Sequence, residues 1–284
     1  MGCGYVPEGD TVWLACQRLN DALAGRVLTH SDFRVPQLAT TDLTGQTVTS
    51  VVSRGKHQLI RLDSGQTLHT HFKMDGSWHL YRPGTKWSGG PEFQVRVVLG
   101  NEKWNVVGYR LPVVELLASA HEAEAVGHLG PDLLGPDWNP VEALRRLLAD
   151  PSREIGEALL DQRNLAGIGN LYKAETLFLS GVTPWTKVGA VGDLGAIVTR
   201  AQRLLDANKS HPAQSTTGDL RRGEQHWVFE RAGRPCRRCG ERIRVAMQGE
   251  APRERVTYWC PRCQTGPAPV AGHQTTSAEG RGSS

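Results

Sequence analysis

The sequence predicts an α+β fold in which a helix and an all-β region are followed by a helical region. Three observations carry this prediction: an amphipathic pattern near the N-terminus, short alternating runs from about Val27 to Leu111, and longer helical periods from Val113 onward. With 284 residues, of which 39% are hydrophobic, the chain is long enough for two packed domains. Its apolar runs fall short of the roughly 18 residues of a membrane span, and it shows no secretion signal, so we expect a cytoplasmic protein with no membrane partner.

The first half of the chain predicts one helix and then strands. Apolar residues recur at helical spacing over residues 7–23, and Gly25 follows as a stop signal. Beyond it, β-branched residues alternate between turns rich in glycine, aspartate and proline. The predicted strands cover residues 47–53, 58–62, 67–72, 93–99 and 104–109. Together they predict a sandwich or a barrel.

The second half predicts helices. Runs of helical length and period cover residues 113–120, 140–149, 155–160, 171–179 and 194–208. A polar, glycine-containing stretch over 210–224 is typical of a loop. The last stretch, 265–284, is rich in glycine, proline, serine and alanine, and we expect it to be disordered.

Four of the six cysteines form two closely spaced pairs. Cys236 with Cys239 and Cys260 with Cys263 are both C-x2-C pairs, and twenty residues separate the two pairs. Four thiolates at this spacing predict one structural zinc ion in a ribbon. Such a site has no open coordination position, so the metal would stabilise the fold and take no part in catalysis.

The same segment is basic. Residues 231–263 contain nine arginines and three glutamates, a net charge of +6 before the cysteines are counted, whereas the whole chain carries +4. Arg253 and Arg255 lie close to Tyr258 and Trp259 in a run that suits a hairpin. This pattern fits a DNA groove, and a solvated arginine face is the alternative.

A glycine-containing turn, NLAGIGN over residues 164–170, separates two predicted helices. Glycines on both sides of Ile168 let the backbone turn sharply and expose N–H groups at the start of the next helix. Such a turn can hold a phosphate. The alternative is a pair of ordinary helix caps that connect two core helices.

Three separated segments match one family pattern. They are Pro7-Glu8-Gly9-Asp10, LAGIGNLYKAE over 165–175, and 228–264 with both cysteine pairs. In this order they resemble the formamidopyrimidine-DNA glycosylase and endonuclease VIII family. The resemblance implies the following organisation: an extension over 1–6, a β-sandwich domain over 7–120, a helix-two-turn-helix domain over 121–225, a zinc ribbon over 226–264 and a tail over 265–284.

The resemblance also implies an enzyme that excises oxidised bases from DNA and nicks the strand. Pro7 would be the nucleophile, Glu8 the neighbouring general acid and base, and Lys56 a catalytic or phosphate-binding lysine. A free N-terminal proline is a secondary amine whose pKa lies below that of lysine, so it can attack the sugar C1′ and form an iminium. The iminium acidifies the C2′ proton and permits β- and then δ-elimination, with a carboxylate carrying protons.

Contacts to DNA follow from the resemblance as well. Asn170 and Arg255 would bind phosphates that flank the lesion, and Met74 would fill the gap left by an extruded nucleotide. Extrusion is needed because the glycosidic bond of a stacked base cannot be reached. A core position is the alternative for Met74, and a solvated loop position is the alternative for Lys56.

The sequence departs from the family pattern in two places. Six residues precede Pro7, so its nitrogen is an amide in the sequence as written and cannot form a Schiff base. We hypothesise that translation begins at Val6 and that removal of this residue exposes Pro7. The segment 101–117 lacks the loop with arginine and phenylalanine that the formamidopyrimidine branch carries, so the chain looks more like endonuclease VIII.

The endonuclease VIII likeness sets the expected partners. We expect double-stranded DNA with oxidised pyrimidines or abasic sites as substrate, and single-stranded or bubble DNA as further forms. We also expect a nucleoid-associated monomer that uses no organic cofactor.

Two other functions stay open on the sequence. A protein that binds damaged DNA without cleaving it would follow if Pro7 stays blocked. A zinc-ribbon protein that binds RNA or the ribosome would explain the basic ribbon and the glycine turn, but it leaves Pro7 and Glu8 unexplained.

Overall fold

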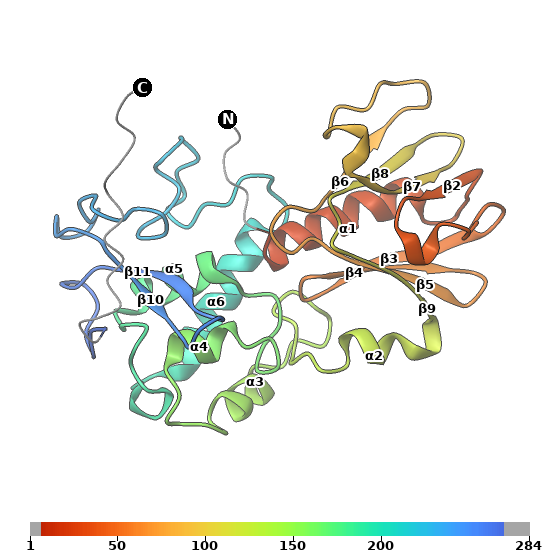
Figure 1. Cartoon of the computed structure of the whole chain (residues 1–284). Coiled ribbons are helices and arrows are strands. Elements are labelled where there is room, and N and C mark those ends of the chain that lie inside the picture. Colours follow the sequence, from red (N-terminus) through yellow and green to blue (C-terminus); the bar gives the residue numbers. More distant parts are fainter. Residues whose placement is uncertain (1–6, 270–284) are drawn as a thin grey trace. The chain divides into compact units, whose positions relative to one another are not determined.

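The computed structural model describes residues 7–269, which form two compact units (Figure 1). Within the described residues, the first unit comprises residues 7–139, 165–167 and 205–212. The second unit comprises residues 140–164, 168–204 and 213–269. The predicted extension over 1–6 and most of the predicted disordered tail lie outside the described residues.

Helix α1 (Gly9–Leu23) opens the first unit, as the amphipathic pattern predicts. At its start, the Thr11 hydroxyl accepts a hydrogen bond from the Glu8 backbone N–H at 2.9 Å and donates one to the Glu8 carbonyl at 2.8 Å. The capping residue therefore immediately precedes the helix. The face of α1 that packs into the core carries Val12, Cys16, Leu19 and Leu23, each at most 1% exposed.

Two antiparallel sheets complete the first unit. Their strand orders are β1-β3-β4-β5-β9 and β2-β7-β8-β6. The strands are β1 (Arg26–Val27), β2 (His30–Phe33), β3 (Thr47–Arg54), β4 (His57–Leu62), β5 (Gln66–His71), β6 (Ser77–Tyr81), β7 (Val95–Gly100), β8 (Asn105–Tyr109) and β9 (Val113–Ala118). Apolar residues of both sheets and of α1 form one buried cluster. This arrangement confirms the sandwich.

The prediction of a helix over residues 113–120 is wrong. These residues form β9, which pairs antiparallel with β5 and places Glu115 opposite His69. A short apolar run fits either period, and the consecutive residues Val113 and Val114 favour extended backbone. Pairing with the edge of β5 decides between the two. The short helix α2 (Glu122–Val126), which the sequence did not predict, follows this strand.

The second unit contains the remaining helices and a hairpin. Helices α3 (Pro140–Leu147), α4 (Ile155–Leu160), α5 (Asn170–Ser180) and α6 (Leu194–Asn208) agree with the predicted helices to within two residues at each end, and only the last turn of α6 clusters with the first unit. The hairpin consists of β10 (Arg244–Gln248) and β11 (Arg255–Trp259). Helix α5 ends at Gly181, whose φ of +71° is the left-handed conformation that favours glycine.

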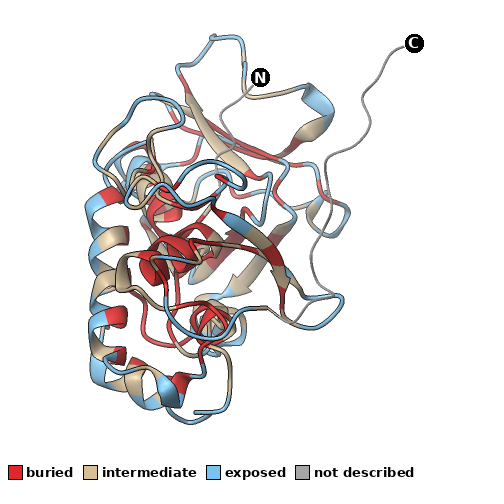
Figure 2. Cartoon of the chain, turned by 90° about the vertical axis from the view of Figure 1, so that its left-hand side faces the viewer, coloured by how far each residue is buried: buried red, intermediate tan, exposed pale blue. Residues whose placement is uncertain are grey.

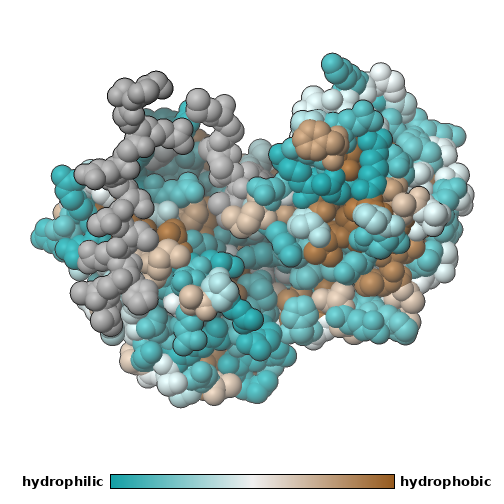
Figure 3. Space-filling view, in the orientation of Figure 1, coloured by the Kyte–Doolittle hydropathy of each residue, from teal (hydrophilic) through white to brown (hydrophobic). Residues whose placement is uncertain are grey.

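The surface follows the usual division between core and solvent. Buried residues concentrate in the strands and on one side of the helices, whereas loops are mostly exposed (Figure 2). Hydrophilic residues cover most of the face that Figure 3 presents. Among residues 7–269, no helix combines the length and the apolar character that crossing a membrane requires.

Candidate active site and metal centre

Pro7 and Glu8 lie at the start of α1 in the first unit. Pro7 is partly exposed and lines a cavity, whereas Glu8 is 0% exposed. The next residue, Gly9, donates its N–H to the Gly167 carbonyl at 2.8 Å. A Cβ on Gly9 would lie 2.9 Å from the Gly167 Cα, so a larger residue would push the two backbones apart. The glycine turn thus fixes the start of the helix that carries Pro7 and Glu8.

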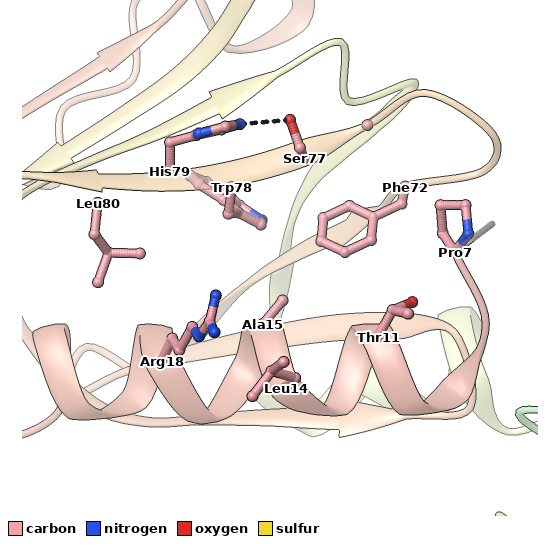
Figure 4. Close-up of a pocket in the computed structure, with 11 residues that line it drawn as sticks. Pro7, Thr11, Leu14, Ala15, Arg18, Phe72, Ser77, Trp78, His79 and Leu80 are labelled. Atoms are coloured by element: carbon pink, nitrogen blue, oxygen red, sulfur yellow. Dashed lines mark hydrogen bonds between the residues drawn. The ribbon is translucent and has the colours of Figure 1, made fainter. Parts of the chain in front are cut away.

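A cavity of about 360 Å³ opens beside Pro7, between α1 and β6 (Figure 4). Thr11, Ala15 and Arg18 extend from the helix toward the side chains of Phe72 and Trp78. The remaining lining residues are Leu14, Gly76, Ser77, His79 and Leu80. Apart from Pro7, the sequence analysis named none of them.

Lys56 occupies the tight turn between β3 and β4. The Gly55 N–H donates to an Asp132 carboxylate oxygen at 2.7 Å, and Arg54 forms an ion pair with Asp137 at 2.7 Å. Gly55 has a φ of +57°, which favours glycine. These contacts hold the turn in place, and Lys56 is partly buried rather than a fully solvated loop residue.

Histidines cluster beside Lys56. His57 Nδ1 lies 2.8 Å from His69 Nε2, and His69 Nδ1 lies 3.0 Å from Glu115 Oε2. The rings of His57 and His71 meet edge to face with centroids 4.7 Å apart. Burial, followed by the positive charges around it, lowers the pKa of His57 to about 3. Burial and then Lys56 lower the pKa of His71 to about 4.

These shifts decide which group carries charge in the cluster. With such pKa values, His57 and His71 are neutral near pH 7. Lys56 and Lys73 are the lysines whose positive charge contributes to the lowered pKa of His71. Sequence patterns do not reveal this cluster, because its members lie on different strands and meet only through strand register.

Met74 lies in the loop between β5 and β6 and is 70% exposed, which rules out the core alternative. The same loop contacts Arg110, whose Nε donates to the Asp75 carbonyl at 3.1 Å. Arg110 has a φ of +49°, unusual for a residue other than glycine. Met74, Arg96 and Arg110 line a second cavity of about 440 Å³. The structure therefore places two arginines near Met74 to which the sequence analysis gave no role.

The four paired cysteines converge in the second unit. All four Sγ atoms lie within 4.8 Å of one another. Cys236 and Cys263 are separated by 3.9 Å between sulfur atoms, and Cys239 and Cys260 by 3.5 Å. Sulfurs at a tetrahedral zinc ion lie about 3.8 Å apart, since each Zn–S bond is about 2.3 Å, and a disulfide would need about 2.05 Å. The four side chains could thus hold one metal ion.

Asn170 and Arg255 come together in the second unit. Asn170 is the first residue of α5, and its Nδ2 donates to the Val256 carbonyl at 2.8 Å. Its Oδ1 is buried and has no hydrogen-bond partner among residues 7–269. Arg255 precedes Val256 in β11 and is exposed. Asn170 therefore contacts the strand that carries Arg255, although 84 residues separate the two in sequence.

Helix α5 anchors the ribbon with two buried charged residues that the sequence analysis did not single out. The Glu175 carboxylate accepts N–H groups from Trp227, Val228 and Phe229 at 2.8 Å each. Lys173 donates its Nζ to the Thr257 hydroxyl at 2.7 Å. Charge-assisted hydrogen bonds of this kind are stronger than neutral ones. They fix both the segment before the ribbon and β11 itself.

Known proteins match the chain along most of its length. Residues 6–110 match the formamidopyrimidine-DNA glycosylase N-terminal domain, and residues 129–208 match the formamidopyrimidine-DNA glycosylase H2TH domain. A probable endonuclease 8 2 from Streptomyces coelicolor is 60% identical over 95% of this chain and 98% of its own length. A DNA-(apurinic or apyrimidinic site) lyase from Mycolicibacterium smegmatis is 46% identical over 92% of this chain and 99% of its own.

A solved structure agrees at the level of the fold. The Lactococcus lactis formamidopyrimidine-DNA glycosylase, solved with DNA containing an abasic site, matches with a TM-score of 0.76 and 20% identity, over 91% of this chain and 100% of that one. The two domain matches cover Pro7 and the glycine turn, and the match to the Streptomyces coelicolor relative extends over 95% of the chain. The chain therefore belongs to the formamidopyrimidine-DNA glycosylase and endonuclease VIII family, in its endonuclease VIII-like branch.

Proposed function

We propose that this chain is a DNA glycosylase with AP lyase activity, which excises oxidised bases and cleaves the strand through Pro7. The observation that carries the proposal is the placement of Pro7 at the mouth of a cavity, directly before the buried Glu8. The names of the endonuclease 8 and AP lyase relatives support the same activity. Oxidised pyrimidines are the favoured bases, and the chain acts as a monomer.

The chemistry requires a free Pro7 nitrogen. The match to the N-terminal family domain begins at residue 6, which supports an active form whose first residue is Pro7. Its secondary amine attacks the sugar C1′, and the departing base takes the electron pair of the glycosidic bond. The amine loses its proton, the C1′–O4′ bond breaks as O4′ takes up a proton, and the opened sugar is left as an iminium. Removal of the C2′ proton then expels the 3′ phosphate by β-elimination, and a second elimination expels the 5′ phosphate.

Glu8 and Lys56 assist the reaction in different ways, one by proton transfer and the other by its positive charge. The Glu8 carboxyl adjoins Pro7 along the chain, so it exchanges protons with the opening sugar ring and the amine. Lys56 supplies the positive charge for a phosphate, since His57 and His71 beside it are neutral. Both residues are proposed catalytic groups.

Three further residues bind DNA in this proposal. Met74 fills the gap in the duplex, for which its 70% exposure suits it. Asn170 and Arg255 bind phosphates. The hydrogen bond from Asn170 to β11, the strand that carries Arg255, supports a shared role of the two residues. Double-stranded DNA with an oxidised base or an abasic site is the main substrate, and single-stranded or bubble DNA is a further form.

The metal in this proposal is one structural zinc ion, held by the four cysteine thiolates. The sulfur separations of 3.5 and 3.9 Å fit its tetrahedral geometry. Bound zinc supplies a rigid crosslink between the two cysteine pairs. The chain's own contribution is the hairpin between them, which presents Arg253 and Arg255 to solvent.

Product analysis tests the proposed function. A duplex with one 5-hydroxyuracil should yield the free base and a strand break with phosphate at both new ends, the signature of β,δ-elimination. Intact free base with an unbroken strand would remove the lyase activity. Binding without base release would favour the alternative, a damaged-DNA-binding protein whose Pro7 stays blocked by the six residues before it.

Mass spectrometry of protein expressed from its native gene should find Pro7 as the first residue, and a mature end at Gly2 would contradict the start-site hypothesis.

A further inference from the structure

The cavity beside Pro7 has the size and position of a base-binding site. If Pro7 attacks C1′ of a nucleotide, the base attached to C1′ must lie within one bond of the attacked atom. The cavity borders Pro7 and belongs wholly to the first unit. Its volume of about 360 Å³ lies at the lower end of the range for small-molecule sites, which is about 300–1,000 Å³.

The walls of the cavity suit a flat ring. Phe72 and Trp78 face α1 across the cavity, and Ala15 lies opposite them (Figure 4). The Trp78 indole Nε1 donates to the Thr70 hydroxyl at 3.4 Å, which fixes the orientation of the ring. Aromatic side chains bind extruded bases by stacking, at small cost because they have few rotatable bonds. The apolar part of the cavity therefore favours a base without selecting among bases.

Arg18 is the charged group of the cavity. Its guanidinium points from α1 toward β6, and within residues 7–269 it forms no hydrogen bond or ion pair. His79, the other titratable side chain of the lining, points away from α1 and its Nε2 lies 3.1 Å from the Ser77 hydroxyl. Guanidinium has five N–H donors and no acceptor, so it demands a ligand rich in acceptor oxygens.

We infer that this cavity takes the extruded base, that Trp78 stacks on it, and that Arg18 selects bases whose outer edge carries a carbonyl oxygen. The inference rests on the proposed glycosylase function and adds a specificity-determining residue to it. Uracil-derived bases present a carbonyl oxygen at C4, which accepts from Arg18. Cytosine-derived bases present an amino group there, which places donor against donor and leaves the arginine unsatisfied.

Two matched lesions isolate this contact. 5-Hydroxyuracil and 5-hydroxycytosine differ in the group at C4 and in the proton on N3, and each is placed in the same duplex. A third duplex carries an abasic site, which has no base and so reports on the lyase step alone. All proteins in this experiment begin at Pro7, and the variants are Arg18→Ala, Arg18→Lys and Trp78→Leu. The controls are Arg203→Ala, an exposed arginine of α6, and Trp87→Leu, a partly buried tryptophan, neither of which lines the cavity.

We expect the excision rates of the two damaged bases to respond differently to the substitutions. The unaltered chain should excise 5-hydroxyuracil faster than 5-hydroxycytosine. Arg18→Ala should slow excision of 5-hydroxyuracil about 10- to 100-fold, because a charged hydrogen bond is lost, and should remove the preference. Arg18→Lys should retain part of the preference, since lysine keeps a charged N–H donor but lacks the paired N–H groups of guanidinium. Trp78→Leu should slow both lesions equally, and neither control should change either rate.

Borohydride trapping on the abasic duplex distinguishes a wrong role for Arg18 from a wrong proposed function. Trapping should stay unchanged in both Arg18 variants. Equal loss on the two lesions, no loss on either, or loss of trapping in a folded Arg18→Ala variant would each overturn the role of Arg18. If the unaltered form that begins at Pro7 neither releases a base nor is trapped, the proposed function itself fails, and that result is distinct from the others.

Discussion

The two units build their candidate sites in different ways. In the second unit the four cysteines that could hold a metal ion form two C-x2-C pairs, so each half of the site lies within four consecutive residues. In the first unit the cavity beside Pro7 combines residues of α1 with residues between Phe72 and Leu80. Short spacing between cysteines in the sequence is therefore enough to identify a candidate metal site. The cavity cannot be identified in this way, because it forms only where elements distant in sequence pack together.

The two units also differ in electrostatics. The first unit holds neutral histidines beside Lys56 and, beside Pro7, a cavity lined by one arginine. The ribbon of the second unit exposes arginines on and beside β11. We propose that the first unit performs the chemistry and that the second mainly binds phosphates. The following predictions test this division.

Removing the metal should give the largest effect and confine it to the second unit. Cys260→Ser removes one of four thiolates, so zinc content falls and the hairpin of β10 and β11 loses its crosslink. We expect DNA binding to weaken on the order of 100-fold, since several phosphate contacts depend on the ribbon. Hydrogen exchange should show lost protection in β10 and β11 and retained protection in α1.

A matched control for this variant is Cys16→Ala, which alters a buried cysteine of α1 and should leave zinc content unchanged. Equal loss of protection in α1 and in the hairpin after Cys260→Ser would show that the units do not respond separately. That result would break the comparison.

Gly9→Ala should act on the first unit alone. The added Cβ meets the Gly167 Cα at 2.9 Å and its carbonyl oxygen at 3.0 Å, both backbone atoms that cannot rotate away. We expect the free energy of unfolding to fall by about 1–3 kcal/mol. Gly192→Ala, where the Cβ meets nothing within 4 Å, should change it by less than about 0.5 kcal/mol. If urea unfolding shows equal losses of stability for Gly9→Ala and Gly192→Ala, the close contact between Gly9 and Gly167 is not what requires glycine at position 9.

Arg255→Ala should weaken DNA binding uniformly across sequences. We expect about tenfold weaker binding, and a slope of log affinity against log salt that is smaller by about 1, as for one lost phosphate contact. Arg262→Ala, an exposed arginine between Cys260 and Cys263, serves as the control on the same ribbon and should change the slope less. A loss that depends on which base is damaged would instead assign Arg255 to base recognition.

The last prediction concerns pH and the histidines of the first unit. Unfolded histidine takes up a proton near pH 6.5, whereas burial holds the pKa of folded His57 at about 3. Between these values the unfolded state binds more protons, so stability falls as pH is lowered, by at most about 1.4 kcal/mol per pH unit for one histidine. His57→Gln should flatten this dependence between pH 6.5 and 4.

Urea unfolding at pH 7 and pH 5 measures the dependence. His211→Gln, which replaces an exposed histidine, should leave it unchanged. If His57→Gln and the unaltered chain lose equal stability between the two values, His57 is not held neutral by burial.

The sequence predicted the helices and the cysteine pairs because each rests on local information. Helical period placed α4 and α6 at their observed bounds. It failed for β9, a strand of six mostly apolar residues whose pattern fits a helix as well as a strand, because pairing with β5 makes this segment extended. It also missed β6, a strand of only five residues that contains serine and histidine.

The candidate site was predicted only in part for the same reason. Pro7, Glu8 and Lys56 were named through their motifs. Arg18 and Trp78 were not, because they meet only where α1 packs beside β6. The histidine cluster depends on register, since a slip of one residue would turn His69 away from Glu115. Alternation along β5 hints at one face that carries His69 and His71, and it does not reveal their partners.

The central claim is that Pro7 forms a covalent bond with DNA. Its most direct test incubates two forms of the chain, one beginning at Pro7 and one with all 284 residues, with abasic duplex DNA and borohydride. The account predicts a covalent adduct from the form that begins at Pro7, and none from the longer form as long as its six additional residues remain attached. If both forms bind the duplex and neither is trapped, Pro7 is not the nucleophile and the account is contradicted.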